Sequence, residues 1–405
     1  MALGMALLPA HALASTHPSV TVPSALIMTM DGRIMWSRHS TDSRRVASTI
    51  KMLNALVVRE HASLDETVTV TRKAARTPDG VGLRRGQKFT VRQLLKFTLV
   101  ASANDAAEAL AIHIGGTEAN YVAMMNAKAK SLGLTRTHAV DPHGLSKREH
   151  STARDLSVIA RQVLKDPVLR KIILLKKVRV RRPGGAYVTA RATNRLLGHY
   201  VGIEGVKTGF TNPAGYCLVS AAKRRPYELV GVVLGARTLD GRFSQTRKLL
   251  DWGFAHVRWR RLVAAGAVCG SATVASGTVP TVAVYAAREA SAVVITVGSK
   301  VATVAVIPRQ IRAPIRRGQQ LGVLRISQRG VVLASVALLA RSDVATASAP
   351  STGPAAPPHV GVQAPVQLSI GSVGLLGHLW DVLAADSELT APVTRRVTLG
   401  VSSPL

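Results

Sequence analysis

Apolar positions along the first two thirds of the chain alternate between strand-like and helix-like spacing. Residues 24–37 place two short apolar runs around the turn Asp31-Gly32, which predicts a β-hairpin. Apolar residues recur at helical spacing over residues 46–61, and mostly helical stretches follow over residues 91–114 and 118–132. This part of the chain therefore combines an early pair of strands with a block of helices.

Strands return after the helical block. Residues 178–180 and 187–190 read as strands joined by a turn at residues 183–185, and residues 216–220 and 227–235 as strands joined by a basic turn. A helix over residues 242–254 closes the region. Helices between early and late strands of one sheet form a helix-on-sheet layer, so we expect an α/β (α+β) domain over residues 23–258.

Beyond residue 259 the pattern changes to short β-rich runs separated by turn residues, which predicts a small all-β domain over residues 259–343. The expected strands cover residues 281–285, 292–297, 301–307, 322–326 and 331–339. An Ala- and Pro-rich linker then occupies residues 344–366. In the tail, residues 367–405, a short amphipathic helix carries Val373, Leu376, Leu379, Trp380 and Leu383 on one face, and it either lies on a membrane surface or packs against the protein.

The first 22 residues resemble a secretory signal. Their apolar run ends in small residues at Ala12 and Ala14, and it lacks the usual basic start, which suggests a true start further upstream. This segment predicts export and an extracytoplasmic location. No other segment has 18 uninterrupted apolar residues, so we expect no transmembrane helix. Cys217 and Cys269 are the only cysteines, and two buried thiols are favoured over one disulfide.

The charge is strongly unbalanced. The 53 Lys and Arg residues against 22 Asp and Glu give a formal net charge of +31. Such a field attracts anionic partners, and the candidates are an anionic wall polymer or a membrane surface. Nucleic acid is not expected, because its recognised reader motifs and basic patches interleaved with aromatic residues are absent. An Arg-rich composition inherited from a high-GC genome is the alternative explanation.

Two Ser-x-x-Lys sequences occur, and their contexts differ. Ser48-Thr49-Ile50-Lys51 begins a predicted helix, where residues three apart share a face, so the Lys51 amine can reach the Ser48 hydroxyl. Ser220-Ala221-Ala222-Lys223 ends a predicted strand, where residues three apart point to opposite faces. A serine hydroxyl needs a neighbouring base, and a lysine serves as one only if burial or nearby charge lowers its pKa. Ser48 is therefore the candidate nucleophile.

Two further motifs follow in the same chain. Ser102-Ala103-Asn104 precedes a helical segment, and Lys207-Thr208-Gly209 precedes the strand predicted at residues 216–220. In this order the three motifs match the signature set of penicillin-binding proteins and serine β-lactamases. The chain resembles the low-molecular-mass D-alanyl-D-alanine carboxypeptidases from about residue 23 to residue 254. The supporting stretches are residues 45–51, 141–145, 193–197, 205–209 and 249–254, and, more loosely for the β-rich part, residues 317–322.

The resemblance implies a β-lactamase/transpeptidase-like catalytic domain and a role for each motif residue. Ser48 would attack the carbonyl of the penultimate D-alanine of a peptidoglycan pentapeptide, with Lys51 as general base and Ser102 as proton relay to the departing D-alanine. Asn104 would hold the substrate amide. In the motif Lys207-Thr208-Gly209, the Lys207 ammonium and the Thr208 hydroxyl would bind the terminal carboxylate. The backbone N–H groups of Ser48 and Phe210 would stabilise the oxyanion. β-Lactams would be covalent inhibitors.

Other functions remain open within the same fold. A β-lactamase of the commonest class uses a Glu in a Glu-x-x-Leu-Asn type motif, and none of Glu108, Glu118, Glu149 and Glu204 has that context. An endopeptidase or a catalytically silent wall-binding protein are further alternatives, although all three motifs are intact. No His-Glu-x-x-His or comparable cluster occurs among the 12 histidines, so neither a metal nor a cofactor is expected, and His143 and His199 read as loop residues.

Overall fold

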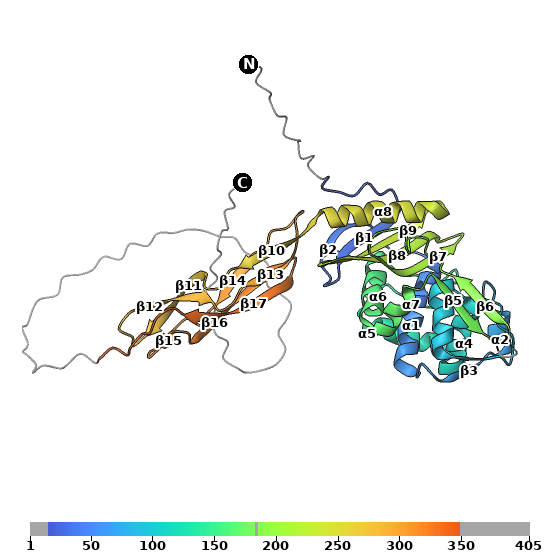
Figure 1. Cartoon of the computed structure of the whole chain (residues 1–405), viewed down its shortest axis with the longest axis horizontal. Helices are drawn as coiled ribbons and strands as arrows, with labels where there is room; N and C mark the ends of the chain where they lie inside the picture. Colours follow the sequence, from blue (N-terminus) through green and yellow to red (C-terminus); the bar gives the residue numbers. More distant parts are fainter. Residues whose placement is uncertain (1–14, 183–184, 349–405) are drawn as a thin grey trace, which may run out of the picture. The chain divides into compact units, whose positions relative to one another are not determined.

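The computed structural model describes residues 15–182 and 185–348, which divide into two compact units (Figure 1). The larger unit contains the described residues up to 260, with residues 291–302 and 327–333. The smaller unit contains residues 261–290, 303–326 and 334–348. Within the described residues, no helix has the length and apolar character needed to cross a membrane.

A five-stranded antiparallel sheet forms the centre of the larger unit, with strand order β2-β1-β9-β8-β7. Its strands are β1 (Ser24–Thr29), β2 (Ile34–Arg38), β7 (Ile203–Thr211), β8 (Gly215–Arg224) and β9 (Tyr227–Ala236). The sequence analysis predicted all of these strands except β7. Lys207 and Thr208 lie in its middle, and the strand is buried on both faces, so it lacks the apolar–polar alternation of an ordinary strand.

Successive residues of the sheet enter two different cores. In β1, Leu26 and Met28 join the core beneath the helical cluster, whereas Ala25 and Ile27 join the core beneath α8 (Leu239–Ala255). Figure 1 shows α8 on one face of the sheet and the other helices on the opposite face. This is the period of two expected for a sheet covered on both sides.

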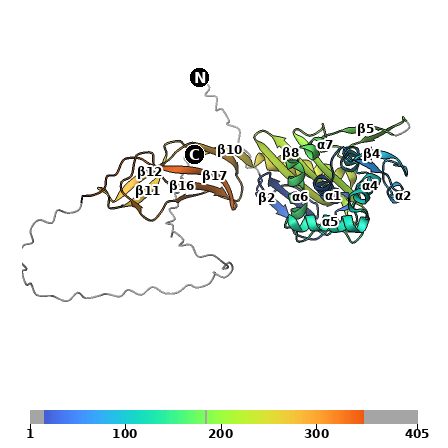
Figure 2. The ribbon, with the colours of Figure 1, turned by 90° about the horizontal axis from the view of Figure 1, so that it is seen from below.

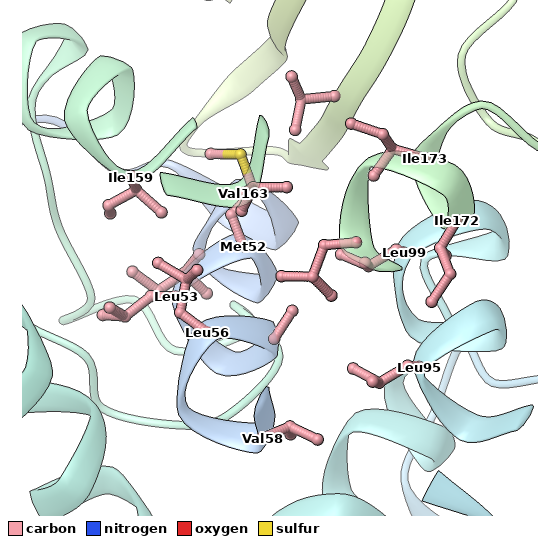
Figure 3. Packing of buried hydrophobic residues seen from close by; sticks show 14 of the residues in the cluster. Met52, Leu53, Leu56, Val58, Leu95, Leu99, Ile159, Val163, Ile172 and Ile173 are labelled. Atoms are coloured by element: carbon pink, nitrogen blue, oxygen red, sulfur yellow. The ribbon is translucent and has the colours of Figure 1, made fainter. Parts of the chain in front are cut away.

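The helix α1 (Lys51–His61) lies inside the helical cluster, and residues 51 to 58 are all buried. It packs against α4, α5 and α6 (Figure 2). Met52, Leu53 and Leu56 project from it among Ile159 and Val163 of α6 (Figure 3). The helix that follows the Ser-x-x-Lys motif is thus fixed by apolar contacts on every side. The other helical elements are α2 (Arg72–Arg76), α3 (Val91–Lys96), α4 (Asn104–Gly115), α5 (Glu118–Ser131), α6 (Ala153–Lys165) and α7 (Pro167–Ile173).

One helical prediction needs correction. The segment expected as a helix over residues 46–61 starts with a 3₁₀ turn, η1 (Ala47–Ile50), before α1 begins. The prediction of a mostly helical stretch over residues 91–114 is confirmed, but the stretch is not one regular helix. After α3 the chain forms a π-helical turn, η2 (Phe97–Ala101), and then breaks at Ser102, whose φ of 62° is left-handed. A non-glycine residue rarely adopts this conformation, and such strain concentrates at functional sites.

Two small antiparallel hairpins complete the larger unit. β3 (Thr67–Thr69) pairs with β4 (Lys88–Thr90), and β5 (Lys177–Arg181) pairs with β6 (Tyr187–Arg191). The second hairpin was predicted. Val178, Val180 and Val188 turn one face of it into the core, so its other face is exposed.

The smaller unit is all-β, as predicted. Its sheet has six strands in the order β14-β16-β17-β12-β11-β15. β10 pairs with β13 in a separate two-stranded sheet, in which β10 up to residue 260 and β13 from residue 291 belong to the larger unit. The strands are β10 (Val257–Val263), β11 (Val268–Ala275), β12 (Thr281–Ala286), β13 (Ala290–Ile295), β14 (Ala302–Val306), β15 (Ile311–Arg312), β16 (Gln320–Gln328) and β17 (Val331–Ala340). The sequence analysis missed β10, β11 and β15. Three of the seven residues of β10 are arginines, and β15 has only two residues.

Cys217 and Cys269 are both free and buried, which confirms the expectation of two buried thiols. Burial raises the pKa of the Cys217 thiol to about 11. Residues 1–14 of the signal-like segment, the linker from residue 349 onward and the tail with its amphipathic helix lie outside the described residues.

Candidate active site

The side chains of Ser48 and Lys51 meet at the start of α1. Lys51 Nζ donates a hydrogen bond to Ser48 Oγ at 2.8 Å, to Asn104 Oδ1 at 2.5 Å and to the backbone carbonyl of His143 at 2.7 Å. Ser48 Oγ in turn lies 3.2 Å from the same carbonyl. Ser48 is partly exposed, whereas Lys51 is completely buried. The amine therefore contacts the Ser48 hydroxyl from the interior of the protein.

Burial gives Lys51 the pKa of a base that works near neutral pH. Removal from water lowers the pKa of its amine from 10.5 to about 7, despite the opposing effect of nearby carboxylates, chiefly Asp141 and Glu149. A low-dielectric environment disfavours the charged form of an amine. At neutral pH a substantial fraction of Lys51 is therefore uncharged and able to accept the Ser48 proton.

The second motif enters the site from the junction between η2 and α4. The left-handed Ser102 turns the chain so that its partly exposed hydroxyl and the buried Asn104 amide both reach the site. Asn104 Oδ1 accepts the Lys51 hydrogen bond, and its Nδ2 donates to the carbonyl of Pro78 at 2.9 Å. The second hydrogen bond fixes the orientation of the amide.

The third motif lies on β7. Lys207 Nζ donates to Ser102 Oγ at 2.7 Å and to the carbonyl of Thr208 at 2.9 Å, and Thr208 Oγ1 lies 2.6 Å from Thr193 Oγ1. Lys207 is completely buried, and burial together with the charges of Lys51 and Arg242 holds the pKa of its amine well below its ordinary value. An incoming anion would stabilise the charged form of this amine, so the site favours a negatively charged ligand.

The loop of residues 141–146 also contributes to the site, although the sequence analysis did not assign it there. Its backbone carbonyl at His143 accepts hydrogen bonds from both Lys51 and Ser48. The Asp141 carboxylate holds the loop by accepting from four successive backbone N–H groups, those of residues 143 to 146. Burial alone would raise the pKa of Asp141, but His143 and these N–H groups hold it below its ordinary value. Residues 141–145 support the family resemblance, but their types do not show that the loop enters the site, because every residue type has a backbone carbonyl.

Gly144 and Gly209 pack against the backbone around Ser48. A Cβ on Gly144, whose φ is +94°, would lie 2.4 Å from the carbonyl of Ala47, and one on Gly209 would lie 3.2 Å from the Ser48 nitrogen. Phe210 follows Gly209 at the site, is 45% exposed and stacks on Tyr216. Close approach of β7 to the Ser48 backbone is the arrangement that two N–H donors for one oxyanion require.

The second Ser-x-x-Lys sequence does not form such a pair. Ser220 is completely buried within β8, and its hydroxyl donates to the carbonyl of Gly231 at 3.0 Å. Lys223 instead forms an ion pair with Glu228 at 3.7 Å. Of the two sequences, only Ser48 and Lys51 are brought together with the other two motifs.

Comparison with known proteins agrees with this geometry. A family model described as D-alanyl-D-alanine carboxypeptidase matches residues 11–238, and one described as the C-terminal domain of penicillin-binding protein 5 matches residues 259–346. The D-alanyl-D-alanine carboxypeptidase DacF of Bacillus subtilis is 30% identical over 329 residues, which cover 78% of this chain and 84% of DacF. DacB2 of Mycobacterium tuberculosis is 37% identical over 231 residues, which cover 55% and 79% of the two chains.

Solved structures show the same relationship. Penicillin-binding protein 5 from Haemophilus influenzae superposes with a TM-score of 0.63 at 28% identity, covering 82% of this chain and 99% of that one. The Streptomyces K15 DD-transpeptidase superposes with a TM-score of 0.56 at 31% identity, covering 59% of this chain and 98% of that one.

Proposed function

Because the chain belongs to the D-alanyl-D-alanine carboxypeptidase family, we propose that it removes the terminal D-alanine of peptidoglycan pentapeptides with Ser48 as its nucleophile. The observation that carries the assignment is the 2.8 Å hydrogen bond from a buried amine, that of Lys51, to a partly exposed serine hydroxyl. A serine becomes nucleophilic when an adjacent base takes its proton.

Acylation follows from this arrangement. Uncharged Lys51 takes the proton of Ser48 as Oγ attacks the carbonyl carbon of the penultimate D-alanine, and the N–H groups of Ser48 and Phe210 stabilise the oxyanion. Collapse of the intermediate breaks the peptide bond and leaves an ester on Ser48. Ser102 relays a proton to the nitrogen of the departing D-alanine, and Asn104 holds the amide of the remaining peptide. Water then hydrolyses the ester.

Selection for a free C-terminus rests on the third motif. The Lys207 ammonium and the Thr208 hydroxyl bind the terminal carboxylate, which would restore the charge that burial disfavours in Lys207. An internal peptide bond offers no carboxylate at this position, which favours carboxypeptidase over endopeptidase activity.

β-Lactams acylate the same serine in this proposal, and the ester they form is long-lived. In the described part of the chain, no carboxylate forms a hydrogen bond or an ion pair with Ser48 or Lys51. A dedicated β-lactamase of the commonest class needs a glutamate to activate the deacylating water. Penicillin is therefore an inhibitor here and not an efficient substrate.

The test is release of D-alanine from a D-Ala-D-Ala peptide, together with labelling by a fluorescent penicillin. Ser48→Ala should abolish both, whereas Ser220→Ala, the matched change in the second Ser-x-x-Lys sequence, should retain both. Persistent labelling of Ser48→Ala would overturn the assignment of the nucleophile. Labelling of the unaltered protein without D-alanine release would favour the wall-binding alternative.

We further propose an anionic wall polymer as a partner outside the cell membrane, bound by the exposed face of the β5–β6 hairpin. Lys177, Arg179 and Arg181 alternate along this face, and Arg191 lies directly opposite Lys177. None of these four cations forms an ion pair within the described residues. Like charges placed opposite each other destabilise a sheet, and an extended polyanion would neutralise them.

Co-sedimentation distinguishes an anionic wall polymer from an anionic membrane surface as the partner. The full chain should sediment with purified phosphodiester wall polymer, and the double variant Arg179→Gln, Arg191→Gln should lose most of this binding, whereas Arg84→Gln, Arg85→Gln should retain it. Equal loss in both double variants would show a general charge effect and contradict the assignment to the hairpin. Binding only to anionic lipid vesicles would favour the membrane surface instead.

A further inference from the structure

Three side chains that take no part in the proposed mechanism come together from distant parts of the sequence, at the loop of residues 141–146, called here the catalytic loop. Glu108 of α4, Glu118 at the start of α5 and the imidazole of His143 place one ligand atom each within 4.8 Å of one another. Two carboxylates and one imidazole form a mixed oxygen and nitrogen donor set, as found in sites for zinc and related divalent ions.

Glu108 lacks the partners that a buried carboxylate needs. Its side chain is 1% exposed, and neither carboxylate oxygen accepts a hydrogen bond within the described residues. The nearest nitrogen atoms are Lys73 Nζ at 3.5 Å and His143 Nε2 at 3.8 Å. Burial and the charge of Glu118 raise the pKa of Glu108 above its ordinary value. Burying an ionised carboxylate in this position costs folding free energy unless a cation approaches it closely.

His143 is oriented as a metal ligand would be. Its Nδ1 lies 2.9 Å from the Asp141 carboxylate, and its Nε2 faces Glu108. In metal sites, a ligating histidine commonly contacts a carboxylate through its second ring nitrogen, which fixes the ring and raises its basicity. Asp141 is itself held by the backbone N–H groups of its loop.

Lys73 already supplies a positive charge at this place. Its amine forms an ion pair with Glu118 and a longer one with Glu108. The side chain is 57% exposed and belongs to the five-residue helix α2, so it can leave without disturbing the core. The cluster borders an open surface cleft of about 720 Å³, lined in part by Arg72, Thr77 and Pro78, which gives a hydrated ion access.

We propose that Glu108, Glu118 and His143 form a binding site for a divalent transition-metal ion, with Zn²⁺ as the best match, and that Lys73 occupies the position of the ion in its absence. Ligand atoms around tetrahedral zinc lie at about 2.0–2.2 Å from the metal. The three groups must therefore move together slightly as Lys73 withdraws.

The ion would connect the elements that hold the catalytic amine. The backbone carbonyl of His143 and the side chain of Asn104, the first residue of α4, both accept hydrogen bonds from Lys51. Glu108 lies one helical turn further along α4. Bound Zn²⁺ would hold this loop against α4 and support the site without touching the substrate.

The test is titration of Zn²⁺ into the metal-free full chain, followed by calorimetry and by metal content after dialysis. One Zn²⁺ should bind per chain. Glu108→Gln should weaken binding about tenfold or more, and Glu66→Gln, the matched change in the surface pair Glu66–His113, should leave it unchanged. Lys73→Met removes the competing cation, so it should tighten binding and lower the thermal midpoint of the metal-free protein, with Zn²⁺ restoring the midpoint.

Equal affinity in Glu108→Gln and the unaltered protein would overturn the proposal, since binding would then come from other histidines. Failure of Zn²⁺ to restore the thermal midpoint of Lys73→Met would overturn it as well, even if Glu108→Gln does not fold. Ser48→Ala should bind Zn²⁺ like the unaltered protein, so this result does not depend on the assignment of the nucleophile.

Discussion

Replacing Lys51 with Met should change how the free energy of unfolding depends on pH. The Lys51 amine has a pKa of about 7 in the folded protein and 10.5 as the reference value. This difference amounts to about 5 kcal/mol between the charged and uncharged forms. Because the folded-state pKa is the lower one, the unfolded chain binds more protons between these two pH values.

The unfolding free energy of the unaltered protein should increase with pH. Stability rises with pH from about 7 to 10.5, because the penalty for burying a charged Lys51 is complete below the folded-state pKa and disappears above the unfolded one. Between pH 7 and pH 9 the unaltered protein should gain about 2 kcal/mol of unfolding free energy relative to Lys51→Met.

Urea unfolding at several pH values measures this difference. Lys223→Met, which alters the partly exposed lysine of the second Ser-x-x-Lys sequence, is the matched control. Parallel curves for Lys51→Met and the unaltered protein would show that Lys51 keeps an ordinary pKa, and would refute its description as a base that burial makes available.

Three further outcomes are expected. The rate of acylation by a fluorescent penicillin should rise as the pH passes about 7, the pKa of Lys51, and a rate independent of pH in this range would contradict the role of Lys51 as base. Gly144→Ala should slow acylation by about tenfold or more, because its Cβ would collide with the Ala47 carbonyl, whereas Gly133→Ala, with φ +70° but open space around it, should not. Lys207→Ala should lower kcat/KM for a D-Ala-D-Ala peptide by about 10- to 100-fold, the value of a charge-assisted hydrogen bond, and steady-state kinetics would show whether it does.

Residue types and local periodicity were sufficient to predict the layered fold and the three motifs. The continuous apolar run Ala25-Leu26-Ile27-Met28 belongs to a strand covered on both faces, and such a run is recognisable in the sequence, whereas the polar residues of β7 hide its strand. Local patterns failed where the backbone departs from a regular element. The left-handed Ser102 interrupts a mostly helical stretch between η2 and α4, which the spacing of apolar residues did not indicate.

The catalytic loop shows a second limit of sequence reasoning. His143 contributes to the site through its backbone carbonyl, which every residue type possesses, so its identity gave no indication of this role. Asp141 contributes by accepting the N–H groups of its own loop, and Arg242 by donating to the carbonyl of Gly209 at 3.2 Å. The contacts of His143 and Arg242 join segments 33 to 95 residues apart, and only the folded chain brings them together.

Mapping the covalent adduct of benzylpenicillin tests the identity of the nucleophile most directly. Trypsin cleaves after Arg45 and after Lys51, so Ser48 lies in the short peptide of residues 46–51, whereas Ser220 lies in a separate peptide of residues 208–223. Mass spectrometry of the labelled, digested protein should find the penicilloyl group on residues 46–51, attached to Ser48. An adduct on any other peptide, or none after prolonged incubation, would contradict the assignment of Ser48 as the nucleophile.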